Sequence, residues 1–135
     1  MVSGGTGSGA TATADGSNPC DGGTIITAGG ATLAERGVTH LAMEASSHGI
    51  DQRRLDGVKL TAAAFTNFTQ DHLDYHGTMG AYRAAKLRLF DTLLPRGRTA
   101  VLNADSDAYS TFAAASIMAG LGVMGVGERG RDLTL

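Results

Sequence analysis

Cysteine and charge are both scarce in this chain. Cys20 is the only cysteine among 135 residues, which excludes an internal disulfide and a zinc site built from cysteines. Charged residues make up 18% of the sequence and leave a net charge of -2. This balance argues against nucleic-acid binding through a general basic field.

Long apolar runs are missing as well. No stretch approaches the roughly 20 apolar residues that a membrane-spanning helix needs. The N-terminus has no basic lead followed by an apolar run, so no signal peptide is expected. We therefore expect a protein of the cytoplasm, with no membrane or nucleic-acid partner. A length of 135 residues suits one domain with a modest core.

Residues 1–30 form a leader rich in Gly, Ser and Thr, with nine of the twenty glycines and no leucine. Such a segment buries too little apolar surface to offset its ordering entropy, so a flexible leader is predicted. Residues 4–11 share the glycine spacing of the phosphate-binding loop G-x-x-x-x-G-K-[ST], but Ala10 stands in the lysine position. Low complexity is therefore the favoured interpretation.

From residue 31 onward, segments typical of strands and helices alternate. The predicted strands are residues 38–43, 59–67, 99–102 and 121–126. The predicted helices are residues 31–36, 79–94 and 106–119, with a polar loop at 71–77 and no further element after 127. The second strand is continuous in small and apolar residues, as a parallel sheet covered on both faces requires. Residues 31–135 thus predict an α/β domain with a partial Rossmann-like, mostly parallel sheet, flanking helices and ligands at its carboxyl edge.

Residues 43–90 concentrate the side chains with chemical potential. Glu44 directly follows a predicted strand, and His72 lies just beyond the next one. In a parallel sheet those strand ends can be neighbours, so a carboxylate and an imidazole could meet there and hold Mg²⁺ or Mn²⁺. The alternative is that Glu44 caps the following turn and His72 is a hydrogen-bonded loop residue.

Polar residues continue after Glu44. Hydroxyls and backbone amides at residues 46–48 suit anionic substrate groups. A Ser–His nucleophile pair is disfavoured there because the G-x-S-x-G elbow is missing. Gln52, Arg53 and Arg54 form a cationic loop whose guanidinium groups can bind phosphate or carboxylate, unless they are only a solvated pair.

Lys86 is an unusual residue for its predicted helix, because Ala84, Ala85 and Leu87 surround it. Such a lysine commonly extends along an apolar face to reach water. A neutral lysine amine can instead react with carbon dioxide, and the carbamate that results is an anion.

Several motifs of this block occur in the order and at the spacing found in Mur ligases. They are Met-Glu-Ala-Ser-Ser-His-Gly (43–49), Gln-Arg-Arg (52–54), Phe-Thr-Asn (65–67), Asp-His-Leu-Asp-Tyr-His-Gly-Thr (71–78) and Tyr-Arg-Ala-Ala-Lys-Leu-Arg-Leu-Phe (82–90). Over roughly residues 33–107 the chain resembles the central domain of these ligases. The most similar type is MurE, which adds a diamino acid to UDP-N-acetylmuramoyl-L-alanyl-D-glutamate.

The resemblance implies a reaction in which ATP phosphorylates a substrate carboxylate and an amine attacks the acyl phosphate. The implied cofactors are ATP and Mg²⁺, and the implied partners are UDP-N-acetylmuramoyl-dipeptide and a diamino acid. By match, Glu44 and His72 would hold Mg²⁺, and Lys86 would be the family's carbamylated lysine beside the metal and the γ-phosphate. These three residues would carry the catalytic role.

The remaining matched positions divide between the two substrates. Ser46, Gln52 and Arg54 would contact the UDP-linked substrate. The motifs expected on the nucleotide side include three further residues, Asn67, Asp71 and Asn103.

The chain also departs from the family pattern. The phosphate-loop lysine, the Thr-Thr-Pro substrate motif and the two flanking domains have no counterpart in these 135 residues. We therefore expect a truncated or rearranged ligase fragment without full activity alone. A non-catalytic remnant that binds UDP-linked ligand or metal is the alternative. A sister ligase, such as folylpolyglutamate or cyanophycin synthetase, is disfavoured by the run that ends at Thr78.

Overall fold

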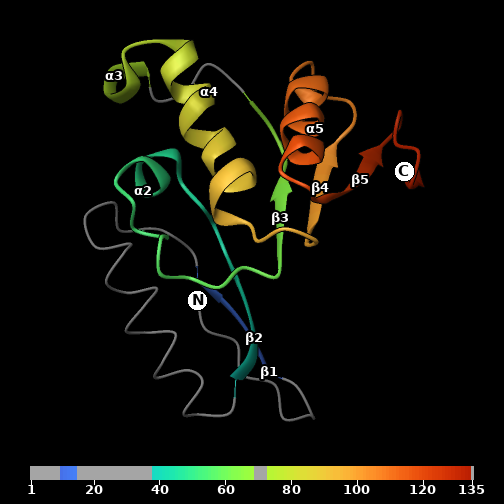
Figure 1. Ribbon diagram of the computed structural model, residues 1–135, viewed down its shortest axis with the longest axis horizontal. Helices are drawn as coiled ribbons and strands as arrows, with labels where there is room; N and C mark the ends of the chain where they lie inside the picture. Colours follow the sequence, from blue (N-terminus) through green and yellow to red (C-terminus); the bar gives the residue numbers. More distant parts are fainter. Residues whose placement is uncertain (1–9, 15–37, 69–72, 135) are drawn as a thin grey trace. The chain divides into compact units, whose positions relative to one another are not determined.

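The computed structural model describes residues 10–14, 38–68 and 73–134. The chain divides into two compact units, Met1–Val58 and Lys59–Leu135. Figure 1 labels their helices and strands. The helix predicted at residues 31–36 and most of the glycine-rich segment lie outside the described residues. Among the residues that are described, no helix is long and apolar enough to cross a membrane.

The described residues of the first unit form two parallel strands and one short helix. Strand β1 (Ala10–Ala14) pairs with β2 (Val38–Met43), whose bounds match the prediction. Five residues of the leader that was expected to be flexible therefore form a strand. Helix α2 (Ser47–Asp51) follows β2, and Ser46 caps it by accepting a hydrogen bond from the backbone N–H of Gly49 at 3.1 Å.

The second unit contains a four-stranded sheet in which every neighbouring pair is parallel. Its strands β3 (Ala62–Phe65), β4 (Thr99–Asn103), β5 (Gly122–Gly127) and β6 (Leu133–Thr134) lie in that order. This arrangement confirms the predicted α/β fold with a parallel sheet. β3 is shorter than the predicted strand because its pairing with β4 covers only Ala62–Phe65.

Strand β6 was not predicted. It pairs with the last two residues of β5. Just before it, Asp132 accepts a hydrogen bond from the Gly125 N–H through Oδ2 at 2.6 Å. The Asp132 N–H in turn donates to the Gly125 carbonyl at 3.2 Å. One aspartate thus satisfies both backbone groups of Gly125 and directs the chain along the β5 edge.

The helices of this unit are α3 (Leu73–His76), α4 (Met79–Arg88), η1 (Leu89–Leu93) and α5 (Tyr109–Met118). Helix α3 corrects the prediction of a polar loop at residues 71–77. The single helix predicted at 79–94 is instead an α-helix that continues as the π-helical turn η1. The wider turn brings Leu89, Phe90 and Leu94 into buried positions.

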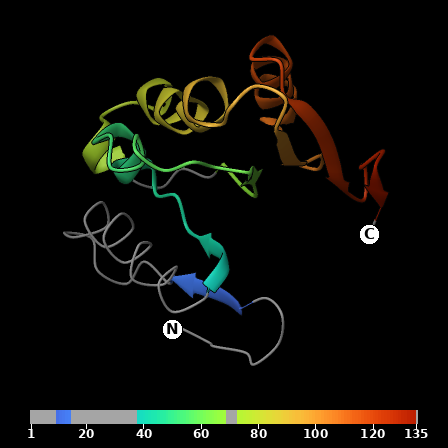
Figure 2. The ribbon, with the colours of Figure 1, turned by 60° about the horizontal axis from the view of Figure 1, so that its bottom comes forward.

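The core of this unit lies between the sheet and α5. Phe112 is fully buried, stacks on Phe65 with ring centroids 4.0 Å apart, and meets Phe90 edge-on at 5.6 Å. Figure 2 shows α4 and α5 on the same side of β3, β4 and β5. Successive parallel strands with crossovers of one hand place their helices on one face. Among the described residues of this unit the opposite face has no helix.

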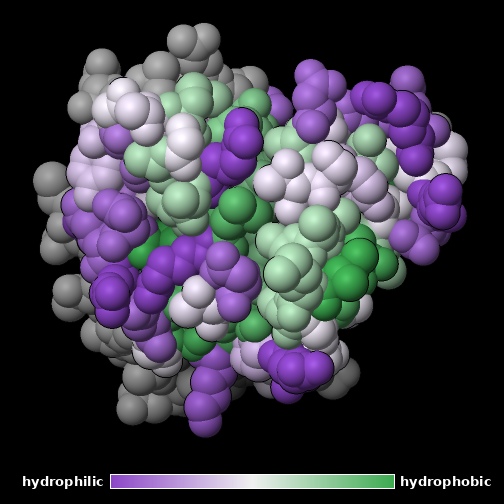
Figure 3. Space-filling view, turned by 45° about the horizontal axis from the view of Figure 1, so that its top comes forward, coloured by the Kyte–Doolittle hydropathy of each residue, from purple (hydrophilic) through white to green (hydrophobic). Residues whose placement is uncertain are grey.

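Part of the α5 surface is apolar and exposed. Ile117 and Met118, at the end of the helix, are 64% and 87% exposed. In the space-filling view of Figure 3, green hydrophobic surface is visible alongside this helix. Phe112 and Ser116, by contrast, point into the core.

Candidate functional site

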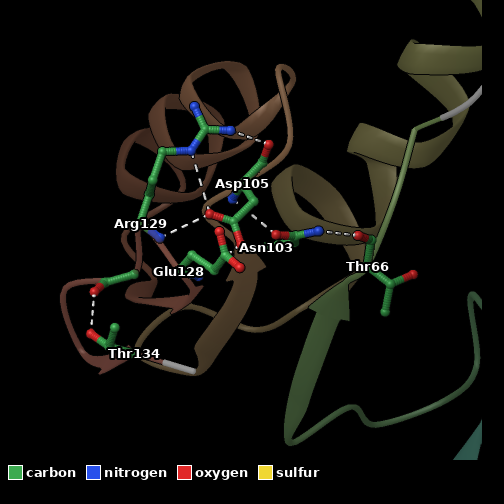
Figure 4. A network of polar contacts seen from close by, with 7 residues as sticks. Thr66, Asn103, Asp105, Glu128, Arg129 and Thr134 are labelled. Carbon is green, nitrogen blue, oxygen red and sulfur yellow. Dashed lines mark hydrogen bonds and ion pairs between the residues drawn. The ribbon is translucent and has the colours of Figure 1, made fainter.

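The carboxyl ends of β3, β4 and β5 are joined by polar contacts. Asn103, the last residue of β4, donates a hydrogen bond from Nδ2 to the Thr66 carbonyl after β3 at 2.8 Å. Its Oδ1 accepts a hydrogen bond from the Asp105 N–H at 2.9 Å. Figure 4 shows this side chain between the two strand ends. Asn103 therefore fixes the start of the loop after β4 relative to β3.

Asp105 extends the same network to the end of β5. Its carboxylate accepts hydrogen bonds from the backbone N–H groups of Glu128 and Arg129, each at 2.8 Å. The Arg129 Nε lies 3.4 Å from Asp105 Oδ1, and the Arg129 guanidinium also donates to the Asp105 carbonyl. Figure 4 shows Arg129 folded back over Asp105. The carboxylate thus caps the turn that follows β5.

These donors also set the protonation of Asp105. The backbone N–H of Arg129 and then that of Glu128 lower the pKa of the Asp105 carboxyl below its ordinary value of 3.8. Partial desolvation opposes this shift, and the Arg129 side chain adds to it. Asp105 is therefore a carboxylate at neutral pH.

Gly127 permits the close approach of Asp105. Its φ is +137°, a conformation that L side chains rarely adopt, and a Cβ at this position would overlap the Asp105 carboxylate. A glycine is needed here for both reasons.

A pocket of about 390 Å³ opens beside this network. It lies between the residues after β3, the exposed side of α4, and the loop that leads into α5. The residues that line it are Asn67, Phe68, Arg83, Asp105, Ser106, Asp107, Ala108 and Thr111. The pocket therefore offers one guanidinium, the Asp107 carboxylate, two hydroxyls and an amide, a set suited to a polar ligand that has both donors and acceptors.

Two of the cationic side chains on helix α4 lie over aromatic rings. The Arg83 guanidinium carbon is 5.4 Å from the centroid of the Phe68 ring, and Lys86 Nζ is 5.2 Å from that of Tyr82. The two rings stack on each other with centroids 4.9 Å apart. Lys86 is half-buried, so only part of its side chain meets water. The aromatic pair thus places both cations on one side of α4.

The substrate residues predicted from the sequence fall around α2 in the first unit. The exposed Ser46 caps the start of that helix, and Gln52 caps its end. Arg54 lies in the following turn, where its N–H donates to the Gly49 carbonyl at 2.9 Å. The preceding residue, Arg53, has a φ of 58°, in the left-handed region. A left-handed residue directly after the Gln52 cap is a common way for a helix to end.

The predicted metal site is only partly described. Glu44 is exposed and directly follows β2, as expected. His72 and Asp71 lie outside the described residues, so the pairing of Glu44 with His72 stays a prediction. Among the described residues, no three His, Cys, Asp or Glu side chains come together in a way that could hold a metal ion.

Several pocket residues were not singled out from the sequence. Asn67 was predicted and lines the pocket, whereas Asn103 bridges two strand ends beside it. Arg83 and residues 105–108 were missed. The signal was the polar run Asn-Ala-Asp-Ser-Asp at 103–107, which directly follows a predicted strand. Polar residues at that position of a parallel sheet favour a ligand site.

The fold and the site define an α/β domain with a polar pocket at the carboxyl edge of a parallel sheet. The family model for the Mur ligase middle domain matches residues 26–134. The chain therefore belongs to the Mur ligase middle-domain family, as its motifs predict.

Two curated relatives share one name. A protein of Caulobacter vibrioides named UDP-N-acetylmuramoyl-L-alanyl-D-glutamate--2,6-diaminopimelate ligase is 71% identical over 105 residues, which cover 78% of this chain and 22% of that protein. A protein of the same name from Mesorhizobium japonicum is 58% identical over 103 residues, covering 76% and 21%. The chain thus spans about a fifth of the length of these relatives.

A solved structure of a ligase of this name is also similar. It superimposes with a TM-score of 0.63 at 36% identity, covering 70% of this chain and 19% of that one. The similarity extends to both sequence and fold, which supports the Mur ligase family over an unrelated α/β domain.

Proposed function

We propose that this chain supplies the middle-domain part of an ATP-dependent ligase of peptidoglycan precursor synthesis. The reaction would add 2,6-diaminopimelate to UDP-N-acetylmuramoyl-L-alanyl-D-glutamate in the cytoplasm. The observation that carries the proposal is the 71% identity over 105 residues with a relative of that name. The relatives' shared name favours diaminopimelate, a choice that the chain's own residues leave open.

ATP is proposed as the nucleotide, and when bound it supplies the phosphoryl group that activates a carboxylate for attack by an amine. The pocket beside Asn103 is the proposed nucleotide site. Its hydroxyls and the Asp107 carboxylate suit sugar hydroxyls, and Arg83 suits an anionic group. Asn67 also lines the pocket and offers an amide donor and acceptor.

Mg²⁺ is the proposed metal. The exposed Glu44 carboxylate, at the end of a strand, is a hard oxygen donor of the kind Mg²⁺ prefers. We assign His72 as a second ligand and the Lys86 carbamate as the anion that supports the metal and the γ-phosphate. Their role would be to hold the reacting phosphate and carboxylate in line.

The UDP-linked substrate is assigned to the turn around α2. Ser46 and Gln52 cap the two ends of α2, and Arg54 lies in the turn that follows this helix. A guanidinium with neighbouring hydroxyl and amide groups suits a diphosphate or a peptide carboxylate. Asp71 belongs to the proposed nucleotide side through the motif it shares with His72.

Ligand-dependent unfolding tests the substrate half of this proposal. The purified 135-residue chain is melted with and without UDP-N-acetylmuramoyl-L-alanyl-D-glutamate and Mg²⁺. Ligand at about a hundred times its dissociation constant should stabilise the chain by roughly 2.7 kcal/mol. The shift should disappear in Arg54→Ala. An unshifted melting point for the folded wild-type chain would contradict substrate binding by these residues.

A segment exchange tests the catalytic half. The homologous segment of the Caulobacter ligase is replaced by residues 31–134 of this chain, and ADP release is measured with both substrates present. We expect activity that requires diaminopimelate and is lost in the matched hybrid with Lys86→Ala. A folded but inactive hybrid, combined with ligand binding by the isolated chain, would identify a binding remnant instead.

A further inference from the structure

Asp105 occupies an unusual position in the pocket wall. It lines the pocket, yet both carboxylate oxygens accept hydrogen bonds from the turn after β5, Oδ2 from Glu128 and Oδ1 from Arg129. Its backbone N–H donates a hydrogen bond to Asn103 Oδ1. The polar groups of Asp105 therefore point toward the protein. Asp105 can act on a pocket ligand chiefly through the residues it holds in place.

The residues it holds are the rest of that wall. Ser106, Asp107 and Ala108 follow Asp105 directly and line the pocket. Their own contacts are local: the Ala108 N–H donates to Ser106 Oγ at 3.3 Å, and the Tyr109 N–H to the Ser106 carbonyl at 3.0 Å. The side chain of Asp105 is thus a direct polar link from this wall to the β5 turn.

The same link reaches β3 through Asn103. Because Asn103 bonds both the Thr66 carbonyl and the Asp105 N–H, the wall is fastened to the strand that precedes Asn67. Asn67 lines the same pocket. One chain of hydrogen bonds thus runs from the Thr66 carbonyl, next to Asn67, through Asn103 and Asp105 to Arg129 (Figure 4).

We propose that Asp105 is a positioning residue for the nucleotide, holding residues 106–108 at the spacing from Asn67 that the ligand requires. The proposal rests on the assignment of the nucleotide to this pocket under the proposed function. Asp105 is not a direct ligand in this scheme. Its contribution is a preorganised wall, which spares the ligand the cost of ordering that wall on binding.

The test uses the whole 135-residue chain, with Mg-ADP as the probe and amide signals as the readout. Asp105→Ala removes both acceptors, and we expect it to weaken Mg-ADP binding by about tenfold. Asp105→Asn keeps one oxygen acceptor and should recover about a third of the lost affinity or more. Amide exchange at Glu128, Arg129 and residues 106–108 should become faster in Asp105→Ala without any ligand.

Two variants serve as matched controls. Asp91→Ala removes the same charge from an exposed site, where its carboxylate accepts a hydrogen bond from the Thr92 hydroxyl, and should leave Mg-ADP affinity unchanged. Arg129→Ala keeps both backbone donors to Asp105, so it should weaken binding less than Asp105→Ala does. Slow exchange at Ala100 and Leu102 in every variant would show that the fold is retained.

Each result decides the proposal. Unchanged Mg-ADP affinity in Asp105→Ala, with faster exchange at Glu128 and Arg129, would overturn it and leave Asp105 as a cap of the β5 turn. If the wild-type chain binds no Mg-ADP, the assignment of the nucleotide to this pocket fails. Amide exchange alone then decides whether Asp105 positions residues 106–108. Faster exchange at residues 106–108 in Asp105→Ala would then support positioning of the wall, and unchanged exchange would refute it.

Discussion

Lys86 Nζ lies over the ring of Tyr82, 5.2 Å from its centroid. The negative face of an aromatic ring attracts an ammonium group and repels an anion. The proposed carbamate of Lys86 is an anion, so this contact favours the uncarbamylated side chain. A carbamate on Lys86 would therefore have to leave this ring face.

Substitution of Tyr82 should change the extent of carbamylation. Losing a contact of about 0.5–1 kcal/mol in Tyr82→Leu should raise the ratio of carbamate to free amine by about two- to fivefold. The carbamate is measured by carbon NMR in labelled bicarbonate, and Lys86→Arg identifies its signal. Tyr82→Phe keeps the ring and should match the wild type. A lower ratio in Tyr82→Leu would mean that the ring assists the carbamate.

The stacked pair of Phe112 and Phe65 should dominate the stability of the second unit. Phe112 is fully buried with ring centroids 4.0 Å from Phe65, so Phe112→Ala should lower the free energy of unfolding by about 3–5 kcal/mol. Urea unfolding measures this change. Met118→Ala, on the same helix but 87% exposed, should stay within about 0.5 kcal/mol of the wild type. Equal losses in the two variants would contradict the assignment of the core.

Alanine substitution at two glycines, Gly97 and Gly127, distinguishes the cost of backbone strain from the cost of steric overlap. Gly97 has a φ of +79° and no atom within 4 Å of the place that a Cβ would take, whereas a Cβ at Gly127 would overlap the Asp105 carboxylate. Gly97→Ala should therefore cost about 1–2 kcal/mol from conformation alone. Gly127→Ala should cost more and should also speed amide exchange at Glu128 and Arg129. Unfolding and exchange are compared in both variants, and equal effects would rule out the close approach of Asp105.

The sequence predicted local elements well and non-local contacts poorly. The strand at 38–43 has the predicted bounds, and β4 extends only one residue beyond its prediction. The π-helical turn was missed because it depends on how Leu89, Phe90 and Leu94 pack, which helical periodicity does not encode. The motifs that identify the family are local as well, so the family was predicted from them.

In the candidate site, too, the residues of local motifs were predicted and the contacts between distant residues were not. Asn67 was predicted because it belongs to a short motif, and it lines the pocket. The role of Asp105 depends on Glu128 and Arg129, which lie 23 and 24 residues further along the chain. Nothing in the spacing of these residues indicates that they meet. Only the parallel pairing of β4 with β5 brings them together.

The lowered pKa of Asp105 predicts a specific loss of stability in acid. Hydrogen bonds from Arg129 and Glu128 stabilise the carboxylate in the folded chain, so the unfolded chain takes up the proton at a higher pH. Because the unfolded state then binds more protons, stability rises with pH across this window. The contribution of Asp105 is fully present above the ordinary value of 3.8 and is lost as the pH falls through the lower pKa of the folded state. Melting curves of the wild type and Asp105→Asn should therefore converge below about pH 4 and differ by a constant amount near neutrality. A difference that stays the same throughout the acid range would show that the Asp105 carboxylate is not held by these donors.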